Sequence, residues 1–461
     1  MTKNRELFET APVPKALAAL AVPTIISQLI TMVYNLADTF FIGTTNDPYK
    51  VAASNIAFVL IFAMNCLSNL FGVGGGSLIS RLLGQKRDSE ASSVASFSFY
   101  GSLVISLIYS LVLLAFMDPF LRLLGATNNT IAYASDYALW VIVIGAVPTT
   151  LGLTLSHMLR SEGFAKHASV GLALGGILNI ILDPIFMFVI LEPGQEVKGA
   201  AIATLISNCA VLVYFLIVHA VIGKKSVISL SPAKMIPKKE HVYSVFAVGF
   251  PSALGSFLAC LTSIMVNKLT SGHGDIEVAA IGIAKKIDML PMNVGMGLCQ
   301  GMMPLVAYNY SSGNYKRMKQ FSDAARIAGI AFAAVCIITF EIFAPHIVEL
   351  FIGEPTTIKL GTHFLRVLCL AVPLMIVNFQ MAFTFQAMGM GKESLILSSL
   401  RQGVVNIPLL FLMNSLFAME GIIWTQLISD VITTVISFII YFRAYKKLLD
   451  KSEKESKTPI V

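Results

Sequence analysis

Two aspartates interrupt stretches of this sequence that are otherwise apolar. Asp183 lies in the middle of one stretch, in the segment 179–186, and Asp38 lies near the end of another, in the segment 35–43. Asp183 follows Asn179 by four residues, so the two side chains share one face of a helix. An ionised carboxylate at mid-bilayer costs about 2.5–3.5 kcal/mol on insertion scales and usually marks an ion or proton path. The pattern therefore predicts a coupling-ion site in an ion-driven transporter.

The candidate ion-binding residues supply oxygen ligands, which Na⁺ and other hard cations require. They comprise two carboxylates, an amide and a hydroxyl: Asp38, Asn179, Asp183 and Thr204. Pro184 has no backbone N–H, so the carbonyl of Ile180 loses its helical partner and becomes a further candidate ligand. The same residues would serve protons, because two carboxylates in a low-dielectric pocket repel each other when both are ionised. Na⁺ and H⁺ therefore both stay open, as does the alternative that each aspartate only hydrogen-bonds a neighbouring helix.

A second group of residues forms a candidate substrate pocket. Its polar and aromatic members are Tyr34, Asn35, Tyr137 and Trp140, and its methionines are Met289 and Met292. Methionine is flexible and polarisable, which suits a promiscuous apolar cavity. Core packing explains the same methionines equally well, and packing or anchoring at the membrane interface explains the aromatic residues.

The elements that must position these residues are long apolar helices. The chain is 56% hydrophobic and only 13% charged, with a mean hydropathy of +0.77. Its apolar residues form twelve continuous blocks, each long enough to cross the bilayer as a helix. The blocks are 16–40, 52–76, 93–117, 134–156, 166–190, 199–221, 243–267, 279–303, 324–346, 361–385, 395–415 and 420–443. Continuous blocks of this length exclude a β-barrel, and we predict an all-α polytopic membrane protein.

The net charge of +7 is explained by topology rather than by a nucleic-acid partner. Basic residues concentrate before the first span, between the sixth and seventh spans, at Lys392 and Arg401 after the tenth, and beyond the twelfth. All of these lie on one side of a zigzag chain. By the positive-inside rule we expect a multi-pass protein of the cell inner (plasma) membrane with both termini in the cytoplasm.

Enzymatic and metal-centre functions find no support in the sequence. The six cysteines show no paired or metal-ligand spacing. The glycine-rich segment 72–77 lacks the lysine of a phosphate loop and is better explained by close helix contact. We therefore expect no enzyme, no cofactor apart from the coupling ion, and no direct use of ATP.

The second half of the chain repeats the first at an offset of about 222–229 residues. Pro23 corresponds to Pro251, the segment 51–57 to 278–284, Asn179 to Asn406, and 205–207 to 427–429. Six spans in each half give both halves the same orientation. We predict two pseudo-symmetric six-helix bundles that alternate access to a central cleft.

The repeat defines the expected domains and shows where the halves differ. The N-terminal lobe is 1–222, the cytoplasmic linker 223–242, the C-terminal lobe 243–446 and the cytoplasmic tail 447–461. The amide at 179 and 406 is present in both lobes, whereas the two aspartates of the ion site have no acidic counterpart. Ion coupling is therefore assigned to the N-terminal lobe.

Two polar clusters of the second half are given structural roles. Lys285, Lys286 and Asp288 open the eighth span, where we expect Asp288 to neutralise one of the lysines. Asp430 corresponds to Asn208 in the repeat, and we expect it to hydrogen-bond a neighbouring helix.

Several motifs, in their order and spacing, resemble the multidrug and toxin extrusion (MATE) transporters along the whole chain. They are Pro23, Tyr34-Asn35, Asp38-Thr39 and Gly43, then the segment 74–77 with Arg81 and Gly84, Arg160 with Gly163, Asn179 with Asp183-Pro184, and the segment 199–204. The acid in the fifth span resembles the DinF-like branch. The chain departs from another branch, which carries carboxylates in the seventh and tenth spans.

The resemblance implies a secondary active transporter that exchanges Na⁺ or H⁺ for amphipathic, often cationic organic compounds. We expect its partners to be the lipid bilayer and small organic substrates, and the protein to be a monomer. A flippase for lipid-linked saccharide or peptidoglycan precursors is the alternative. A flippase needs basic residues to grip pyrophosphate, and the first six spans have none away from their ends.

Overall fold

A computed structural model describes residues 3–457, and all regular elements within that range are helices. In the N-terminal half they are α1 (Lys3–Glu9), α2 (Val13–Gly43), α3 (Pro48–Gly84), α4 (Asp88–Ala115), α5 (Met117–Leu123), α6 (Ile131–Ala138), η1 (Leu139–Ile144), α7 (Ala146–Ser161), α8 (Ala165–Ile185), η2 (Phe186–Ile190) and α9 (Glu196–Ile222). The connection holds η3 (Gly223–Lys225) and η4 (Pro232–Lys234). The C-terminal half contains α10 (Lys239–Thr270), α11 (Asp275–Ser311), α12 (Tyr315–Glu349), α13 (Pro355–Cys369), α14 (Val372–Met388), α15 (Gly391–Ser399), η5 (Leu400–Val404) and α16 (Asn406–Lys457).

These helices account for the twelve predicted spans. Eight segments of the described chain are long and apolar enough to cross a membrane, and the bent pairs α6–η1 with α7 and α13 with α14 raise the number to ten. One of the eight, Gly391–Leu448, contains two spans, because the backbone at Ala418 leaves the helical region and breaks α16 there. The 37-residue α11, about 55 Å long at 1.5 Å per residue, supplies the remaining span.

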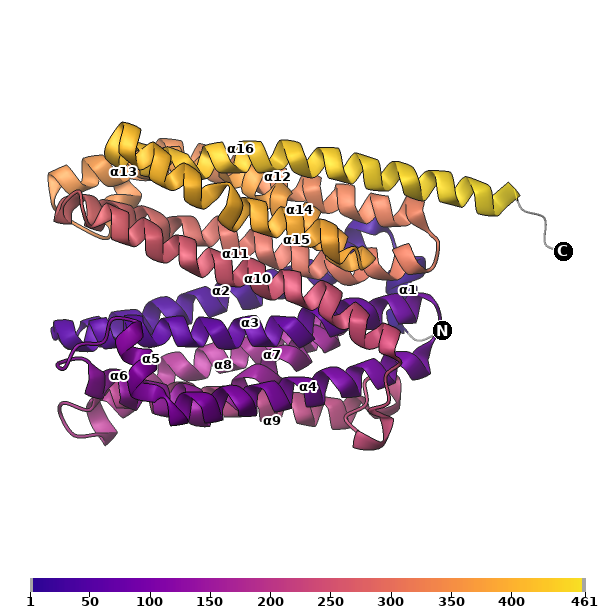
Figure 1. Ribbon diagram of the computed structural model, residues 1–461, viewed down its shortest axis with the longest axis horizontal. Helices are drawn as coiled ribbons and strands as arrows, with labels where there is room; N and C mark the ends of the chain where they lie inside the picture. The colour runs from indigo at the N-terminus through magenta and orange to yellow at the C-terminus, as the bar shows by residue number, and fades with distance from the viewer. Residues whose placement is uncertain (1–2, 458–461) are drawn as a thin grey trace.

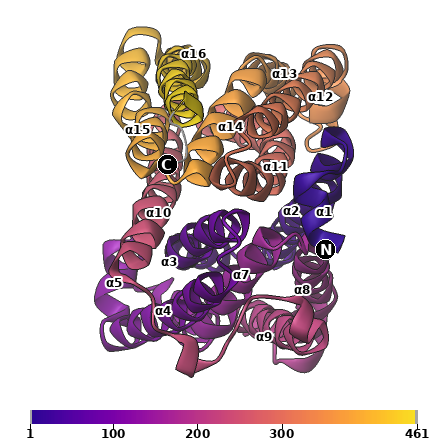
Figure 2. The same ribbon diagram turned by 90° about the vertical axis from the view of Figure 1, so that its right-hand side faces the viewer.

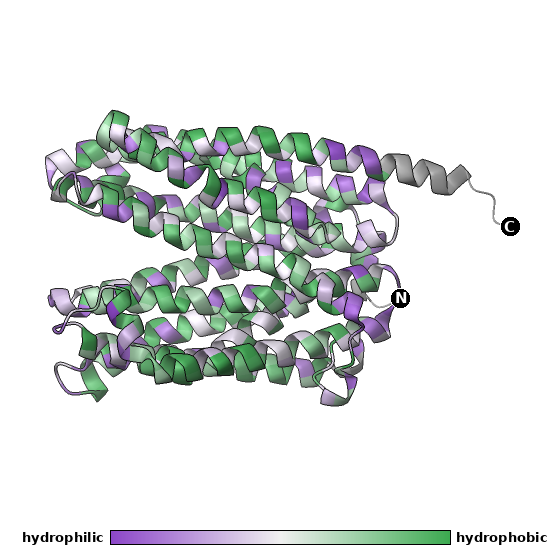
Figure 3. Cartoon of the chain, in the orientation of Figure 1, coloured by the Kyte–Doolittle hydropathy of each residue, from purple (hydrophilic) through white to green (hydrophobic). Residues whose placement is uncertain are grey.

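The spans form two lobes that correspond to the halves of the sequence. Helices α2 to α9 form one group and α10 to α16 the other (Figures 1 and 2). Hydrophobic residues cover most of the length of the helices, and hydrophilic ones gather towards the two ends (Figure 3). Large apolar side chains such as Leu111, Ile217 and Phe442 are exposed on the outer faces, as expected of a surface that contacts lipid.

Glycines allow the lobes to approach closely where α3 packs against α10. A Cβ added at Gly74 would overlap the carbonyl of Val245, and one added at Gly249 would overlap the backbone of Leu70. Within the N-lobe, a Cβ at Gly72 would lie 2.8 Å from the imidazole of His157. The glycine-rich segment therefore serves helix contact, as the sequence predicted.

The polar contacts between the lobes gather at the end of the molecule that holds α1. Ser77 donates to the carbonyl of Gln386 at 2.6 Å, and Ser311 donates to the carbonyl of Arg81 at 2.6 Å. Asn69 and Ser256 form the hydrogen bond that lies deepest between the lobes. At the opposite end, the described residues form no hydrogen bond or ion pair across the lobes. The lobes are therefore joined at the α1 end.

The first helix was missed by the sequence analysis because it is short and polar. It binds the opposite lobe: Phe8 stacks on Tyr308, and Glu9 accepts a hydrogen bond from the Tyr308 hydroxyl at 2.6 Å. Arg317 of α12 donates to the carbonyls of Phe8 and Ala11. α1 thus adds contacts to the joined end, where the segment between α9 and α10 also lies (Figure 1).

The connection between the lobes is an extended segment tied to the N-lobe. Glu162, in the turn after α7, accepts hydrogen bonds from the Ser226 hydroxyl and from the backbone of Val227 and Ile228. α10 begins at Lys239, four residues before the expected domain boundary, and α16 continues through much of the expected tail. The last part of that tail, 458–461, lies outside the described residues.

Candidate functional site

The predicted ion-binding residues come from three helices of the N-lobe. Asp38 lies on α2, Asn179 and Asp183 on α8, and Thr204 on α9. The amide of Asn179 donates to Asp183 Oδ1 at 3.0 Å and to Thr204 Oγ1 at 3.2 Å. Asp183 is fully buried and Asn179 is 2% exposed. The structure therefore brings the fifth-span amide and acid together with the sixth-span hydroxyl.

Asp38 approaches this group from the neighbouring helix α2, together with Tyr137. The Tyr137 hydroxyl donates to Asp38 Oδ2 over a long 3.5 Å. The carboxylates of Asp38 and Asp183 also act on one another electrostatically. Tyr137, which the sequence analysis assigned to substrate binding, therefore lies at the acidic site. Its contact with Asp38 was not predictable from the sequence, because the two residues belong to different spans.

Three oxygens of the site have no hydrogen-bond partner in the described part of the chain. They are buried acceptor atoms on three residues: Asp38 Oδ1, Asn179 Oδ1 and Asp183 Oδ2. No lysine, arginine or histidine there forms an ion pair with Asp38 or Asp183. Buried polar groups in proteins are nearly always satisfied. The unsatisfied acceptors therefore fit a bound cation or proton.

The ligand set suits a hard monovalent cation better than a transition metal. No group of three or more His, Cys, Asp or Glu in the described chain could hold a metal ion. The site instead offers carboxylate, amide and hydroxyl oxygens, which are the ligands of hard cations. Asp38, Asn179, Asp183 and Thr204 are thus the residues that would hold Na⁺ or accept H⁺.

Helix irregularities accompany the polar residues. π-helical turns follow Tyr137 at Leu139–Ile144 and follow Asp183 at Phe186–Ile190, and a third carries Arg401 at Leu400–Val404. Such turns are rare and often occur at functional sites. They widen the helix where polar side chains face the lobe interior, a feature that hydrophobic periodicity does not reveal.

The predicted substrate residues are divided between the lobes. Tyr34 and Asn35 lie on α2 one turn before Asp38, and Tyr34 also contacts α8 near Gly176. Trp140 packs against the apolar cluster around Tyr137. Met289 and Met292 lie on α11 of the other lobe, where Met292 packs against a cluster containing Ile376. The four polar and aromatic residues thus lie in the N-lobe and the two methionines in the C-lobe, and their role in binding substrate stays a prediction.

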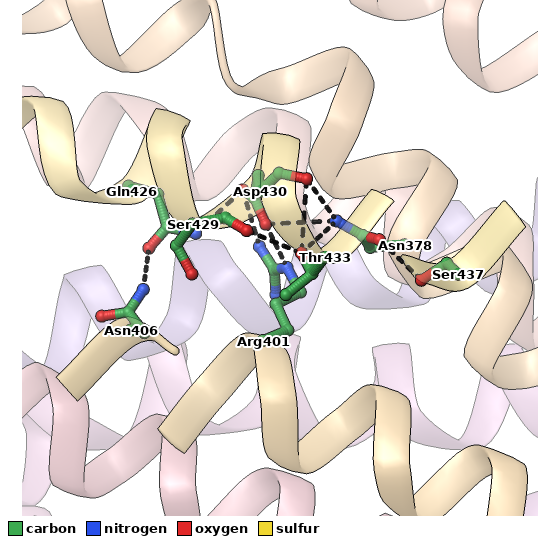
Figure 4. A network of polar contacts seen from close by, with 8 residues as sticks. All are labelled: Asn378, Arg401, Asn406, Gln426, Ser429, Asp430, Thr433 and Ser437. Carbon is green, nitrogen blue, oxygen red and sulfur yellow. Dashed lines mark hydrogen bonds and ion pairs between the residues drawn. The ribbon is translucent and has the colours of Figure 1, made fainter. Parts of the chain in front are cut away.

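The C-lobe contains a second polar network, which the sequence did not predict as a unit (Figure 4). Arg401 donates to the two carboxylate oxygens of Asp430 from Nε at 2.7 Å and from Nη2 at 3.3 Å. Gln426 and Asn378 donate to the same carboxylate, at 2.9 and 3.3 Å. Arg401 also lies over the ring of Phe379, 4.5 Å from its centroid.

The structure corrects one of the sequence-based assignments in the C-lobe and supports two others. Arg401 is not part of a cytoplasmic rim, because it is 7% exposed and paired inside the lobe. Asp288 lies near Lys285 and the two attract each other electrostatically, as expected, but they form no close ion pair among the described residues, and Asp288 Oδ1 is buried without a hydrogen bond there. Asp430 does bond neighbouring helices, as expected, with an arginine as its main partner.

The two networks occupy corresponding places in the repeat. In the N-lobe, Asn179 reaches across to Thr204 on the next span; in the C-lobe, Asn406 reaches across to Gln426 at 3.2 Å. Asn179 and Asn406 correspond, and so do Thr204 and Gln426. The sites therefore share a framework and differ in charge.

Comparison with known proteins identifies the framework. The MatE family model matches the chain twice, over residues 23–185 and 251–412, once in each lobe. The Multidrug export protein MepA of Staphylococcus aureus (strain MRSA252) is 35% identical over 448 residues, which are 97% of each chain. MepA of Staphylococcus saprophyticus subsp. saprophyticus is 33% identical over 447 residues, again 97% of each chain.

Solved structures agree with the fold. One described as the outward-facing conformation of a multidrug resistance MATE family transporter has a TM-score of 0.91 at 24% identity, covering 98% of this chain and 99% of that chain. A crystal structure of MATE in the straight conformation has a TM-score of 0.90 at 25% identity, covering 98% and 100%. The sequence motifs, the twelve spans and these matches agree, and the chain belongs to the MatE family of multidrug and toxin extrusion transporters.

Proposed function

We propose that this protein is a multidrug efflux transporter that exchanges Na⁺ or H⁺ for amphipathic, often cationic organic compounds. The observation that carries the proposal is the acidic site of the N-lobe. It has two carboxylates and three unsatisfied buried oxygens, and no basic side chain in the described part of the chain forms an ion pair with it. Relatives that are 35% identical over nearly the whole chain are multidrug export proteins, which supports the same function.

In this proposal, the coupling ion joins two helices of the N-lobe. Asp38 lies on α2 and Asp183 on α8, and their charges repel while both are ionised and no cation is bound. A Na⁺ ion or a proton removes that repulsion and supplies the missing partner for the free oxygens. Ion binding therefore favours an arrangement in which α2 and α8 hold the two carboxylates close together. The ion then has different affinities for the two conformations of the transporter, as alternating access requires.

In the same proposal, the substrate binds between the two lobes and crosses the membrane as they alternate access. The lobes are joined at the α1 end by the contacts of α3, α10 and α11 and separate at the other. We infer that release of substrate to the outside precedes the opening of the α1 end to the cytoplasm. The residues that recognise substrate stay a prediction, with Tyr34, Asn35 and Trp140 in the N-lobe and Met289 and Met292 in the C-lobe.

The orientation is part of the proposal. The α1 end, with the segment 223–238, carries the basic loops and would face the cytoplasm of a cell whose plasma membrane holds the protein as a monomer. Cysteines placed at Thr45 and Gly272, in matching loops after the first and seventh spans, should react with an impermeant maleimide in intact cells. Lys225→Cys should react only after permeabilisation. Labelling of Lys225→Cys from outside would reverse the orientation.

The transport test uses everted membrane vesicles and a fluorescent organic cation. The lumen of such vesicles corresponds to the cell exterior, so a lumen rich in Na⁺ or a lumen of low pH should each be tested as the driving force. We expect accumulation of the dye with at least one gradient, and none with Asp183→Asn. Equal accumulation without any gradient, or with the Asp183 variant, would contradict ion-coupled efflux.

A further inference from the structure

A small cavity at the joined end lies between the two lobes. Helices α3, α7, α11 and α14 form its walls, and its polar lining residues are Ser80, His157, Arg160, Ser161 and Gln300. Its volume of about 20 Å³ accommodates one species about the size of a water molecule. No acidic side chain of the described chain lines it.

Arg160 brings an uncompensated positive charge to this cavity. Its side chain is buried, with the residue 4% exposed. Its Nη1 donates to Gln300 Oε1 at 3.2 Å, whereas Nε and Nη2 have no hydrogen-bond partner in the described chain. It forms no ion pair there, in contrast to Arg401. A guanidinium keeps its charge in proteins, and a buried charge without a partner is costly.

The other polar groups of the cavity do not supply the missing negative charge. The Ser80 hydroxyl donates to the carbonyl of Ser161 at 2.8 Å, and the Ser161 hydroxyl donates to the carbonyl of Met158 at 2.6 Å. Besides Arg160, the remaining lining residues are glycines and apolar side chains, apart from the uncharged amide of Gln300 and the imidazole of His157. A water molecule in the cavity would accept from the free N–H groups and would leave the charge in place, whereas an anion meets both needs.

We propose that the cavity binds one small monovalent anion of halide size, which pairs with Arg160. The small volume favours a monatomic anion over carboxylate or phosphate compounds. Since α7 and α11 come from different lobes, the cavity is complete only while the lobes are joined at this end. A halide bound there therefore stabilises the joined arrangement by mass action.

The test compares anions at constant Na⁺ concentration, so that the coupling ion does not change. Purified full-length protein is titrated with sodium chloride or sodium bromide against sodium gluconate, and its thermal unfolding is followed. We expect a saturable rise in the unfolding temperature with halide and none with gluconate. Arg160→Gln should lose that rise.

Arg317→Gln is the matched control. Arg317 also lies at the joined end, but it donates to the carbonyls of Phe8 and Ala11 and does not line the cavity. This variant should keep the halide dependence even if its unfolding temperature is lower. A halide effect of equal size in Arg160→Gln would overturn the proposal.

Crystals of the unaltered protein grown in bromide provide a measurement that does not depend on any variant. Anomalous scattering should place one bromide next to the Arg160 guanidinium. A water molecule in that position, with no anomalous signal, would overturn the proposal whatever the variants do. The transport proposal is independent of either result, since Arg160 lies apart from the acidic site.

Discussion

The acidic site of the N-lobe and the Asp430 network of the C-lobe share an asparagine bridge between spans and differ in charge: the first holds two carboxylates, and the second holds one carboxylate paired with an arginine. Asn179 and Asn406 each reach from one span to the next, but among the described residues a basic side chain, Arg401, is bound to the acid of the C-lobe network and none to those of the N-lobe site. Both carboxylate oxygens of Asp430 are hydrogen-bonded, whereas Asp38 and Asp183 each keep one free oxygen. The Arg401 guanidinium already pairs with Asp430, so this carboxylate does not require a bound metal ion or a proton to balance its charge.

This difference in charge predicts different roles for the two copies of the fold. A site with unpaired buried acids is stable only with a cation or a proton, so its occupancy can drive a conformational change. In the C-lobe network, the Arg401 guanidinium balances the charge of the Asp430 carboxylate. On this contrast in charge we propose that ion coupling belongs to the N-lobe.

The largest effect should follow neutralisation of the N-lobe acids. Asp183→Asn retains the size of the side chain but cannot bind and release a cation, so ion-driven efflux should fall to the level of cells without the transporter. Asp38→Asn should behave alike, and the double variant should be no worse than either single one. Expression should be near normal. Drug resistance at the original level in cells carrying Asp183→Asn would remove the basis of the comparison.

The next largest effect concerns stability and belongs to the C-lobe. Arg401→Gln leaves Asp430 buried without its partner, which typically costs about 3–5 kcal/mol. The unfolding temperature of the purified protein should fall clearly, and adding Asp430→Asn should recover part of the loss. The control is Arg366→Gln, whose ion pair with Glu341 is half exposed and should matter by about 1 kcal/mol or less. Equal losses in both variants would show that Arg401 is not a special partner.

A matched pair of asparagine variants sharpens the comparison. Asn179→Ala removes a side chain that touches Asp183 and Thr204, so it should weaken the dependence of transport on the ion gradient. Asn406→Ala removes the corresponding contact with Gln426 and should leave that dependence unchanged. Vesicle transport at several Na⁺ and H⁺ gradients measures both. Equal loss of ion dependence in the two variants would mean that the lobes share coupling.

The smallest effect should come from Tyr137→Phe. The hydroxyl donates to Asp38 over 3.5 Å, so its loss should change the apparent affinity for the coupling ion by roughly a few-fold, as expected for a weak hydrogen bond. Tyr109→Phe is the control, because its hydroxyl donates to the carbonyl of Leu60. An unchanged ion affinity in Tyr137→Phe would return Tyr137 to the substrate pocket or to packing.

Much of the architecture was predictable from local pattern. Apolar length predicted the twelve spans, and the repeat predicted two lobes of equal topology, because helices in a bilayer satisfy their own backbone hydrogen bonds. Asn179 and Asp183 were predictable as a pair because they are one helical turn apart. Irregular features such as the break at Ala418 and the three π-helical turns left no periodic signal.

The sequence by itself determined which residues cross the membrane and that acids lie among them, since both follow from composition along one helix. Only the tertiary structure decided their partners. Arg401 was counted with the basic rim after the tenth span, although it lies within the apolar block 395–415, and packing directs it towards Asp430, which is 29 residues away. Tyr137 and Asp38 are 99 residues apart and meet because their helices pack together. Partners across helices depend on how whole faces fit, and this information is not contained in any one segment.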